Sequence, residues 1–220
     1  MDRANDPAAE RLTLVIGDRN LSSWSLRPWL AARQAGIPFA EIAVRLGQPD
    51  SAESIRRHSP SGKVPCLLVG EGTARWPIWD SLAICEYLAE QNPDLWPTDR
   101  AQRAEARSVS AEMHSGFSAL RQHLSMNINA SRPLPSLPPD VAADVGRIIA
   151  IWESCRARHG RQGGFLFGTF SIADAMYAPV VWRFRTYAID VPSASQDWLQ
   201  TMLDLPAMRE WQAGALAEAG

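Results

Sequence analysis

Short apolar runs and helically spaced apolar residues alternate along the first part of the chain. Residues 12–16 form a run of leucine and β-branched side chains, which predicts a strand. The apolar positions 82, 84, 85 and 88 follow the spacing of a helix. The same patterns predict strands over residues 12–16, 39–45, 64–69 and 74–78, helices over residues 25–34 and 81–90, and a short polar helix or irregular turn over residues 51–58. The predicted order is βαβαββα.

The pattern after residue 98 is helical throughout. Two prolines within residues 91–98 mark the boundary, and four prolines exclude a regular helix from residues 131–140. Apolar residues recur every three or four positions in two stripes suited to core burial: Ala106, Val109, Met113, Phe117, Leu120 and Leu124, then Val141, Val145, Ile148, Trp152 and Cys155. Ser171 and Asp174 form a capping box at the start of a further helix. The final segment is amphipathic around Trp198, Leu203, Met208 and Trp211. The sequence predicts an α/β domain over residues 11–91 and an all-α domain over residues 98–220.

Composition narrows the function classes without choosing one. Of the 220 residues, 46% are apolar, which is enough for ordered cores. The formal net charge is −2 with acidic and basic residues nearly balanced, which argues against binding of nucleic acid or of a membrane surface through bulk charge. No stretch reaches the roughly 20 apolar residues of a membrane span. Residues 1–11 lack the apolar centre of a secretion signal.

The three cysteines are widely spaced and form no CxxC pair. Neither a disulfide framework nor a metal site is therefore expected. Cys85 and Cys155 lie at apolar helical positions and Cys66 lies in a predicted strand, which favours buried and inert thiols. A reducing cytoplasm is the expected location.

The segment Ser22-Ser23-Trp24-Ser25-Leu26-Arg27 follows the first predicted strand and opens the first predicted helix. Unpaired backbone N–H groups and the helix dipole favour a negative charge at such a position, by about 0.3–1 kcal/mol for each interaction. A hydroxyl that donates a hydrogen bond to a thiolate there adds about 1.5–3 kcal/mol. Together these effects lower the pKa of a free thiol from about 8.5 towards neutrality. The simpler interpretation is that Ser22 and Ser23 only cap the helix.

This motif and two others, taken in order, resemble the cytosolic glutathione transferase superfamily, and the likeness covers nearly the whole chain from Leu12 onward. The first motif is similar to the SSCSxR stretch of the zeta class, the maleylacetoacetate isomerase-like transferases, but Trp24 stands where that class carries cysteine. The resemblance implies a thioredoxin-like α/β N-terminal domain, an all-α C-terminal helical domain and a homodimer. It also implies glutathione as co-substrate, with Ser22, and next to it Ser23, as the catalytic hydroxyl that activates the thiol.

The second motif is Pro60-Ser61-Gly62-Lys63-Val64-Pro65, and in thioredoxin-like folds the proline at this position is cis. The bend leaves the backbone N–H and C=O of Val64 free to pair with the cysteinyl unit of glutathione as an added strand. Lys63 would then lie near the glycine carboxylate. An ordinary solvated lysine is the simpler interpretation of Lys63.

The third motif, Asp80-Ser81, opens a predicted helix. Ser81 and the first backbone N–H groups of that helix suit the γ-glutamyl carboxylate of glutathione. Asp80 could pair with the ammonium group of the same γ-glutamyl residue. A plain helix cap is the alternative.

Residues on the first long helical segment extend the candidate site. In the architecture implied by the resemblance, one flank of this segment faces the glutathione cleft. His114 and Arg121 are therefore candidates for the electrophile pocket, with Trp24 as an apolar wall. A solvated helix face is the alternative for His114 and Arg121.

The predicted function is that of a glutathione S-transferase that activates the glutathione thiol through a serine hydroxyl, for conjugation or isomerisation of a small electrophile. The likeness of the SSxSxR pattern to the zeta class implies isomerisation of a maleyl-type cis-enone as the favoured reaction. One alternative is a non-catalytic glutathione-fold binding protein. Another is a glutathione-dependent thiol–disulfide oxidoreductase, which would need a nucleophilic cysteine of its own.

Overall fold

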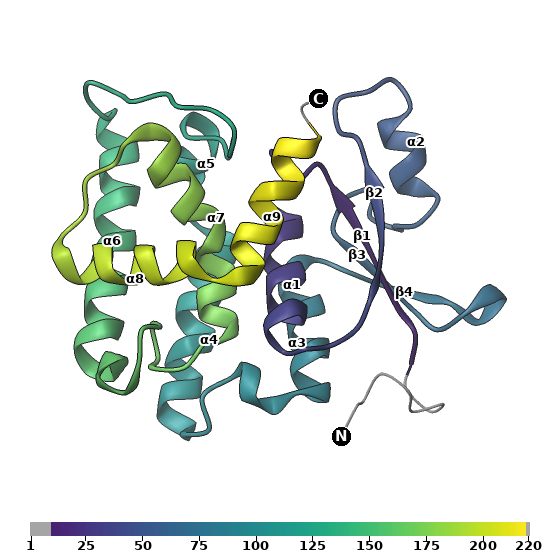
Figure 1. The fold of residues 1–220 in the computed structure, drawn as a ribbon, viewed down its shortest axis with the longest axis horizontal. Helices are drawn as coiled ribbons and strands as arrows, with labels where there is room; N and C mark the ends of the chain where they lie inside the picture. The colour runs from purple at the N-terminus through teal and green to yellow at the C-terminus, as the bar shows by residue number, and fades with distance from the viewer. Residues whose placement is uncertain (1–9, 219–220) are drawn as a thin grey trace.

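The computed structural model describes residues 10–218, which form a four-stranded sheet domain followed by a domain of helices (Figure 1). The predicted first domain, residues 11–91, lies wholly within the described part. Most of the polar segment 1–11 and the last two residues of the predicted second domain lie outside it.

The predicted order βαβαββα of the first domain is confirmed. Its elements are β1 (Leu12–Gly17), α1 (Ser23–Gln34), β2 (Ala40–Val44), α2 (Ser51–Arg56), β3 (Cys66–Val69), the 3₁₀ turn η2 (Gly72–Ala74), β4 (Trp76–Trp79) and α3 (Ser81–Gln91). Helix α1 begins at Ser23 rather than at residue 25. Strand β3 begins only after Pro65, because proline has no N–H to give to a ladder. Strand β4 begins later than predicted because η2 occupies the residues before it.

The sheet has the order β2-β1-β3-β4, with β1 parallel to β2 and the other two neighbouring pairs antiparallel. Helices α1 and α3 lie between the sheet and the helical domain, and α2 lies on the opposite face (Figure 1). Side chains alternate along a strand, so β1 supplies both cores. Leu14 and Ile16 pack in the core that contains α1 and α3, whereas Val15 packs with Ile55 of α2.

The second domain consists of helices in the described residues. They are η3 (Pro93–Leu95), α4 (Arg100–Ser115), α5 (Ser118–His123), α6 (Pro139–His159), η4 (Gly160–Gln162), α7 (Ile172–Tyr187), α8 (Ser193–Asp204) and α9 (Pro206–Ala217). Helix α7 is buried along almost its whole length and packs against both α1 and α4. It therefore joins the two domains.

In the second domain, three helix boundaries differ from the sequence pattern. The first apolar stripe is buried as predicted but is divided between α4 and α5, because Phe117 adopts a left-handed conformation with a φ of 60°. Helix α6 already begins at Pro139, the first helical position, where a proline is tolerated because that N–H has no helical partner. The final amphipathic segment is two helices, α8 and α9, with Pro206 at the start of the second.

Helix α9 closes the structure against the first domain, packing on α1 and α8 (Figure 1). The loop between α5 and α6 also reaches the first domain. In that loop Ile128 donates its backbone N–H to Asn20 O at 3.3 Å, and Arg132 donates to Thr186 O of α7 at 2.7 Å. Within residues 10–218, no helix is both long enough and apolar enough to span a bilayer.

Candidate functional site

A cavity of about 560 Å³ lies where α1, β3 and α3 begin. Its lining residues are Trp24, Ser61, Lys63, Val64, Pro65, Trp79, Asp80 and Ser81. Six of them are predicted site residues from three separate stretches of sequence. The sequence prediction missed the other two, Ser61 and Trp79, although each lies within or next to a predicted motif.

The wall between α2 and β3 contains the second motif. The Val64–Pro65 peptide bond is cis, as the family resemblance implied. Sheet pairing begins only at Cys66, which pairs with Trp79 of β4. Among residues 10–218, no partner for the backbone N–H or C=O of Val64 is found. The edge of Val64 is therefore available to an extended peptide.

Asp80 has a particular conformation at the start of α3. Its φ is 79°, and its Oδ1 atom accepts hydrogen bonds from the backbone N–H groups of Leu82 at 2.8 Å and Ala83 at 3.3 Å. The other carboxylate oxygen, Oδ2, lies 3.1 Å from His114 Nε2. Ser81 is buried, and its Oγ atom accepts a hydrogen bond from Arg27 Nη1 at 3.4 Å.

The indole of Trp24 is surrounded by cationic and aromatic side chains. The guanidinium carbons of Arg27 and Arg121 lie 4.2 Å and 4.7 Å from its ring centroid. His114 approaches the same ring edge-on, with the centroids 5.3 Å apart. These distances are within the range of cation–π attraction. His114 and Arg121 are therefore brought together with Trp24, although neither lines the cavity itself.

Three arginines from both domains lie beside Trp24 and Ser23. Arg27 is only 1% exposed, and burial together with Arg121 and Arg183 lowers its pKa to about 9. Burial and Arg121 lower the pKa of Arg183 to about 10. Both guanidinium groups remain charged at neutral pH. In the described part of the chain, Arg27 Nε has no hydrogen-bond partner. Because Arg27 touches Ser81 and Trp24, it places positive charge directly behind the cavity. The sequence carried no local signal for Arg183, which lies within a largely apolar helix.

The two predicted serines lie at the N-terminus of α1, where anion binding was expected, but neither lines the cavity. Both are buried. Ser22 Oγ donates to Ser25 Oγ at 2.7 Å, and Ser25 Oγ also accepts from Gly17 N at 3.1 Å. Ser23 Oγ accepts a hydrogen bond from Arg183 Nη2 at 3.3 Å. The Ser22 hydroxyl therefore donates to Ser25, whereas among residues 10–218 no acceptor for the Ser23 hydroxyl is found.

None of the cysteines has the properties of a nucleophile. All three are buried and free. Burial raises the pKa of Cys66 to about 11 and that of Cys155 to about 12, and it raises the pKa of Cys85 further still. A thiol–disulfide oxidoreductase needs a thiolate near neutral pH, so these thiols do not support that alternative.

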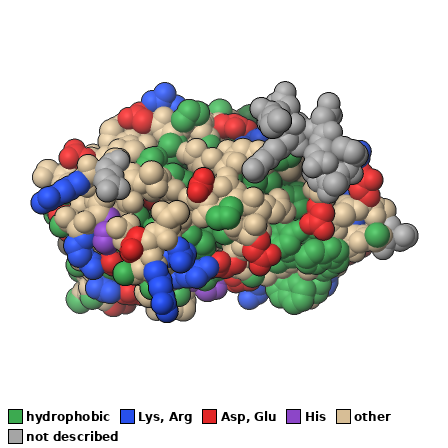
Figure 2. All heavy atoms as spheres, turned by 90° about the horizontal axis from the view of Figure 1, so that it is seen from below, with side chains coloured by type: hydrophobic (Ala, Val, Ile, Leu, Met, Phe, Trp, Pro, Cys, Tyr) green, Lys and Arg blue, Asp and Glu red, His purple; other side chains and the backbone are tan. Residues whose placement is uncertain are grey.

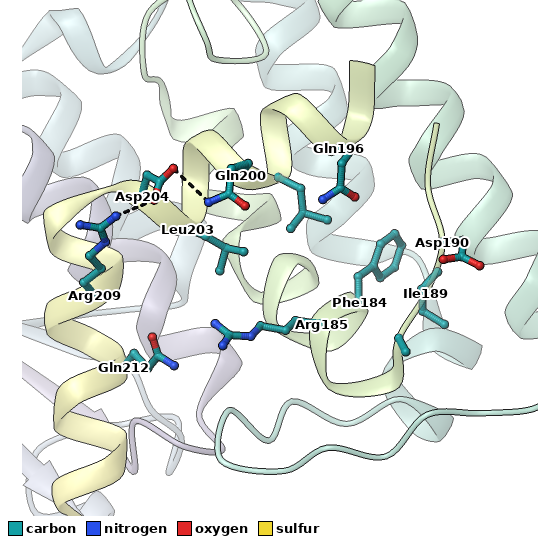
Figure 3. A pocket seen from close by; sticks show the side chains of 12 residues that line it. Phe184, Arg185, Ile189, Asp190, Gln196, Gln200, Leu203, Asp204, Arg209 and Gln212 are labelled. Carbon is teal, nitrogen blue, oxygen red and sulfur yellow. Dashed lines mark hydrogen bonds and ion pairs between the residues drawn. The ribbon is translucent and has the colours of Figure 1, made fainter. Parts of the chain in front are cut away.

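A second cavity, also of about 560 Å³, lies in the helical domain between α7, α8 and α9 (Figure 3). Its apolar floor includes Phe184 and Leu203. Its charged rim contains Asp204, which pairs with Arg209 and accepts a hydrogen bond from Gln200 at 3.0 Å. Among residues 10–218, the two cavities share no lining residue. The predicted site residues therefore select the cavity beside α3.

Comparison with known proteins identifies the family. Residues 21–91 match the family model of the glutathione S-transferase N-terminal domain, and residues 100–212 match that of the glutathione S-transferase C-terminal domain. A probable maleylacetoacetate isomerase from Caenorhabditis elegans is 35% identical over 194 residues, which cover 86% of this chain and 87% of that protein.

Solved structures agree with the family models. Glutathione transferase Omega 2S from Trametes versicolor, in complex with 2,4-dihydroxybenzophenone, superposes with a TM-score of 0.73 at 18% identity, covering 96% of this chain and 97% of that one. A theta class glutathione S-transferase from Xanthomonas axonopodis pv. citri, with glutathione bound, gives a TM-score of 0.65 at 25% identity, covering 94% and 98%. The chain therefore belongs to the glutathione transferase family of enzymes, and it has that family's fold of a thioredoxin-like α/β domain followed by an all-α domain.

Proposed function

We propose that the enzyme binds glutathione in the cavity beside α3 and activates the glutathione thiol at the N-terminus of α1 for attack on a small electrophile. The observation that carries the proposal is the meeting of Lys63, Val64, Asp80 and Ser81 in one cavity. They come from two distant motifs, and together they offer a partner for each charged or peptide group of the tripeptide.

Each part of glutathione has a complementary group. The unpaired backbone of Val64 would pair with the cysteinyl unit, and Lys63 would face the glycine carboxylate. Ser81 and the first N–H groups of α3 would bind the γ-glutamyl carboxylate, while Asp80 would bind its ammonium. The buried positive charge of Arg27 behind Ser81 favours the same carboxylate.

Ser23 is the better candidate for the sulfur-facing hydroxyl, although the sequence motif favoured Ser22. A hydroxyl activates a thiol by donating its proton to the sulfur. Ser22 donates to Ser25, whereas Ser23 accepts from the charged Arg183 and has its proton free. A hydrogen bond received from a cation also polarises the Ser23 hydroxyl and makes it a stronger donor.

The favoured reaction is isomerisation of a maleyl-type cis-enone, and conjugation is the second candidate. The thiolate would add to the double bond, the electron pair would move to the carbonyl oxygen as an enolate, rotation would follow about the new single bond, and loss of the thiolate would restore the double bond. The probable maleylacetoacetate isomerase among the relatives supports this reaction. The positive charges of Arg27, Arg121 and Arg183 suit an acidic electrophile.

A thiolate titration of the glutathione complex tests the proposal. The ultraviolet absorbance of bound thiolate is measured against pH for the wild type, Ser23→Ala and Ser22→Ala. We expect Ser23→Ala to raise the pKa of the bound thiol by about 1, the equivalent of about 1.4 kcal/mol, and Ser22→Ala to change it less. If neither substitution raises that pKa, activation by serine is wrong.

The proposal includes a cytoplasmic homodimer. Three free buried cysteines suit a reducing compartment. Hydrophobic side chains gather at the end of the molecule that carries the sheet (Figure 2). Trp76 of β4, which does not line the glutathione cavity, is 45% exposed, and exposed apolar groups of this size often mark an interface. Light scattering that gives twice the chain mass of 24.3 kDa would support the dimer.

A further inference from the structure

We infer that His114 is a positioning residue for the glutathione site, which holds the Asp80 carboxylate from the helical domain so that Asp80 can receive the ammonium group of the γ-glutamyl residue. The inference rests on the proposed function, since it assigns a new role within the same cavity. It also moves His114 from the electrophile side, where the sequence suggested it, to the glutathione side.

The two oxygens of Asp80 have separate roles. Oδ1 is occupied by the backbone N–H groups of Leu82 and Ala83 at the start of α3. Oδ2 faces His114 Nε2 at 3.1 Å, across the boundary between the domains. The Asp80 side chain is still 42% exposed, so a ligand cation can reach it. A carboxylate oxygen can accept more than one hydrogen bond. His114 therefore orients Oδ2 and still leaves it able to accept a hydrogen bond from the ligand ammonium.

The imidazole is itself held in place. Its ring meets Trp24 edge-on with centroids 5.3 Å apart, and its side chain is only 26% exposed. Nδ1 is buried and has no hydrogen-bond partner in the described part of the chain. Hydrogen bonding to Asp80 therefore selects the neutral tautomer with its proton on Nε2. In this state Asp80 keeps its full negative charge for the ligand.

Burial opposes the protonation of His114, whereas the charged groups around it act in both directions. Burial lowers the pKa of His114 below its usual 6.5, and Arg27 of α1 and Arg121 of α5 act in the same direction. Asp80 at the start of α3 raises the pKa of His114, and its influence is smaller than that of burial but larger than that of either arginine. Once protonated, His114 would pair with Asp80 as a cation and compete with the ligand ammonium. Glutathione affinity should therefore fall as the pH drops through the lowered pKa of His114.

The test compares dissociation constants for glutathione and for an analogue that lacks the γ-glutamyl ammonium, measured by calorimetry on the full-length protein. We expect the wild type to prefer glutathione by about tenfold, or about 1.4 kcal/mol. Asp80→Asn should remove the preference, and His114→Ala should reduce it to about threefold or less. His114→Gln should retain it near neutral pH, because the glutamine amide also donates a hydrogen bond towards Asp80.

The pH dependence separates positioning from a merely structural role. As the pH falls below 6.5 and through the lowered pKa of His114, the wild type should progressively lose its preference for glutathione, whereas His114→Gln, which has no imidazole to protonate, should keep it. If His114→Ala does not fold, the comparison of the pH profiles of His114→Gln and the wild type still tests the positioning role of His114. The inference would be overturned if His114→Ala kept the full preference for glutathione over the analogue. It would also be overturned if His114→Gln had the same pH profile as the wild type. Failure of the wild type to bind glutathione would instead overturn the proposed function.

Discussion

Burial keeps the three thiols of this protein protonated. Cys66 pairs with β4 through its backbone, and its Sγ donates to His58 O at 3.4 Å, while its pKa is raised from 9.0 to about 11. A raised pKa means that the neutral thiol is favoured by folding. Its contribution to stability is therefore fully present below pH 9.0 and is lost as the pH rises through about 11.

We expect the three thiols not to react with a disulfide reagent in the folded protein at about pH 8, and to react once urea has unfolded the protein. The urea concentration at the unfolding midpoint should decrease as the pH is raised from about 9 to about 11. Cys66→Val removes one titrating group from the core and should make that fall shallower. Rapid labelling of any thiol in the folded protein would contradict the burial of these side chains.

The sequence predicts a serine pair at the start of α1 as the activating group but does not distinguish between its two members. The position of Ser22 and Ser23 is a local property, since it follows from a strand that ends and a helix that begins. The state of each hydroxyl is not local. Ser23 receives its hydrogen bond from Arg183, 160 positions away. For the same reason, no local pattern in the sequence connects His114 with Asp80, because their contact depends on how the two domains dock.

At the scale of elements, periodicity predicted which residues are buried better than where helices end. All six residues of the first apolar stripe are buried, yet the stripe spans two helices. The break lies at Gly116, where an added Cβ would meet Glu112 O at 2.9 Å, followed by the left-handed Phe117. Helical spacing survives such a break because both helices face one core, so the pattern alone does not reveal it.

The capping box of α7 was predicted correctly, but its wider role was not. Asp174 is fully buried and accepts hydrogen bonds from Ser171 N at 2.9 Å, Leu166 N at 2.9 Å and Trp198 Nε1 at 2.8 Å. It therefore joins the start of α7 to the preceding loop and to α8. Removing it leaves several buried donors without a partner.

We expect Asp174→Ala to lower the free energy of unfolding by about 3 kcal/mol or more, since each buried unsatisfied donor costs about 1–3 kcal/mol. Asp99→Ala is the matched control. Asp99 caps α4 through one hydrogen bond to Gln102 N at 2.8 Å, but it is exposed. It should cost only about 1 kcal/mol. Equal losses in urea unfolding would show that Asp174 acts as a simple cap.

At the scale of the whole molecule, α9 holds the helical domain against the first domain through contacts with Arg19. Trp211 of α9 donates its Nε1–H to Arg19 O at 2.8 Å. The Arg19 side chain pairs with Glu41 of β2 and with Glu218 just beyond α9. The docking of α1 beside α7 and α9 also fixes the distance between Trp24 and the residues of α4 and α5 that contact it.

The substitution Gly214→Ala tests whether the contacts of Arg19 hold α9 against the first domain. A Cβ at Gly214 would lie 2.4 Å from Arg19 Cδ, whereas a Cβ at Gly146, in the exposed part of α6, would meet nothing within 4 Å. Alanine in a helix gains about 0.5–1 kcal/mol over glycine. Gly146→Ala should therefore raise the free energy of unfolding by about that amount. Gly214→Ala should lower it, because the Arg19 side chain must shift and its pairing with Glu41 and Glu218 is disturbed.

The two effects at Gly214 can be separated by removing Arg19. In an Arg19→Ala background the added methyl group no longer meets the Arg19 side chain. Gly214→Ala should then raise the free energy of unfolding by the same amount as Gly146→Ala. The difference between the two backgrounds is the coupling energy of the pair, which we expect to be about 1–2 kcal/mol. A coupling near zero would mean that Arg19 rearranges freely around the new methyl group. In that case α9 would be held by Trp211 and the apolar core, and not by the ion pairs of Arg19.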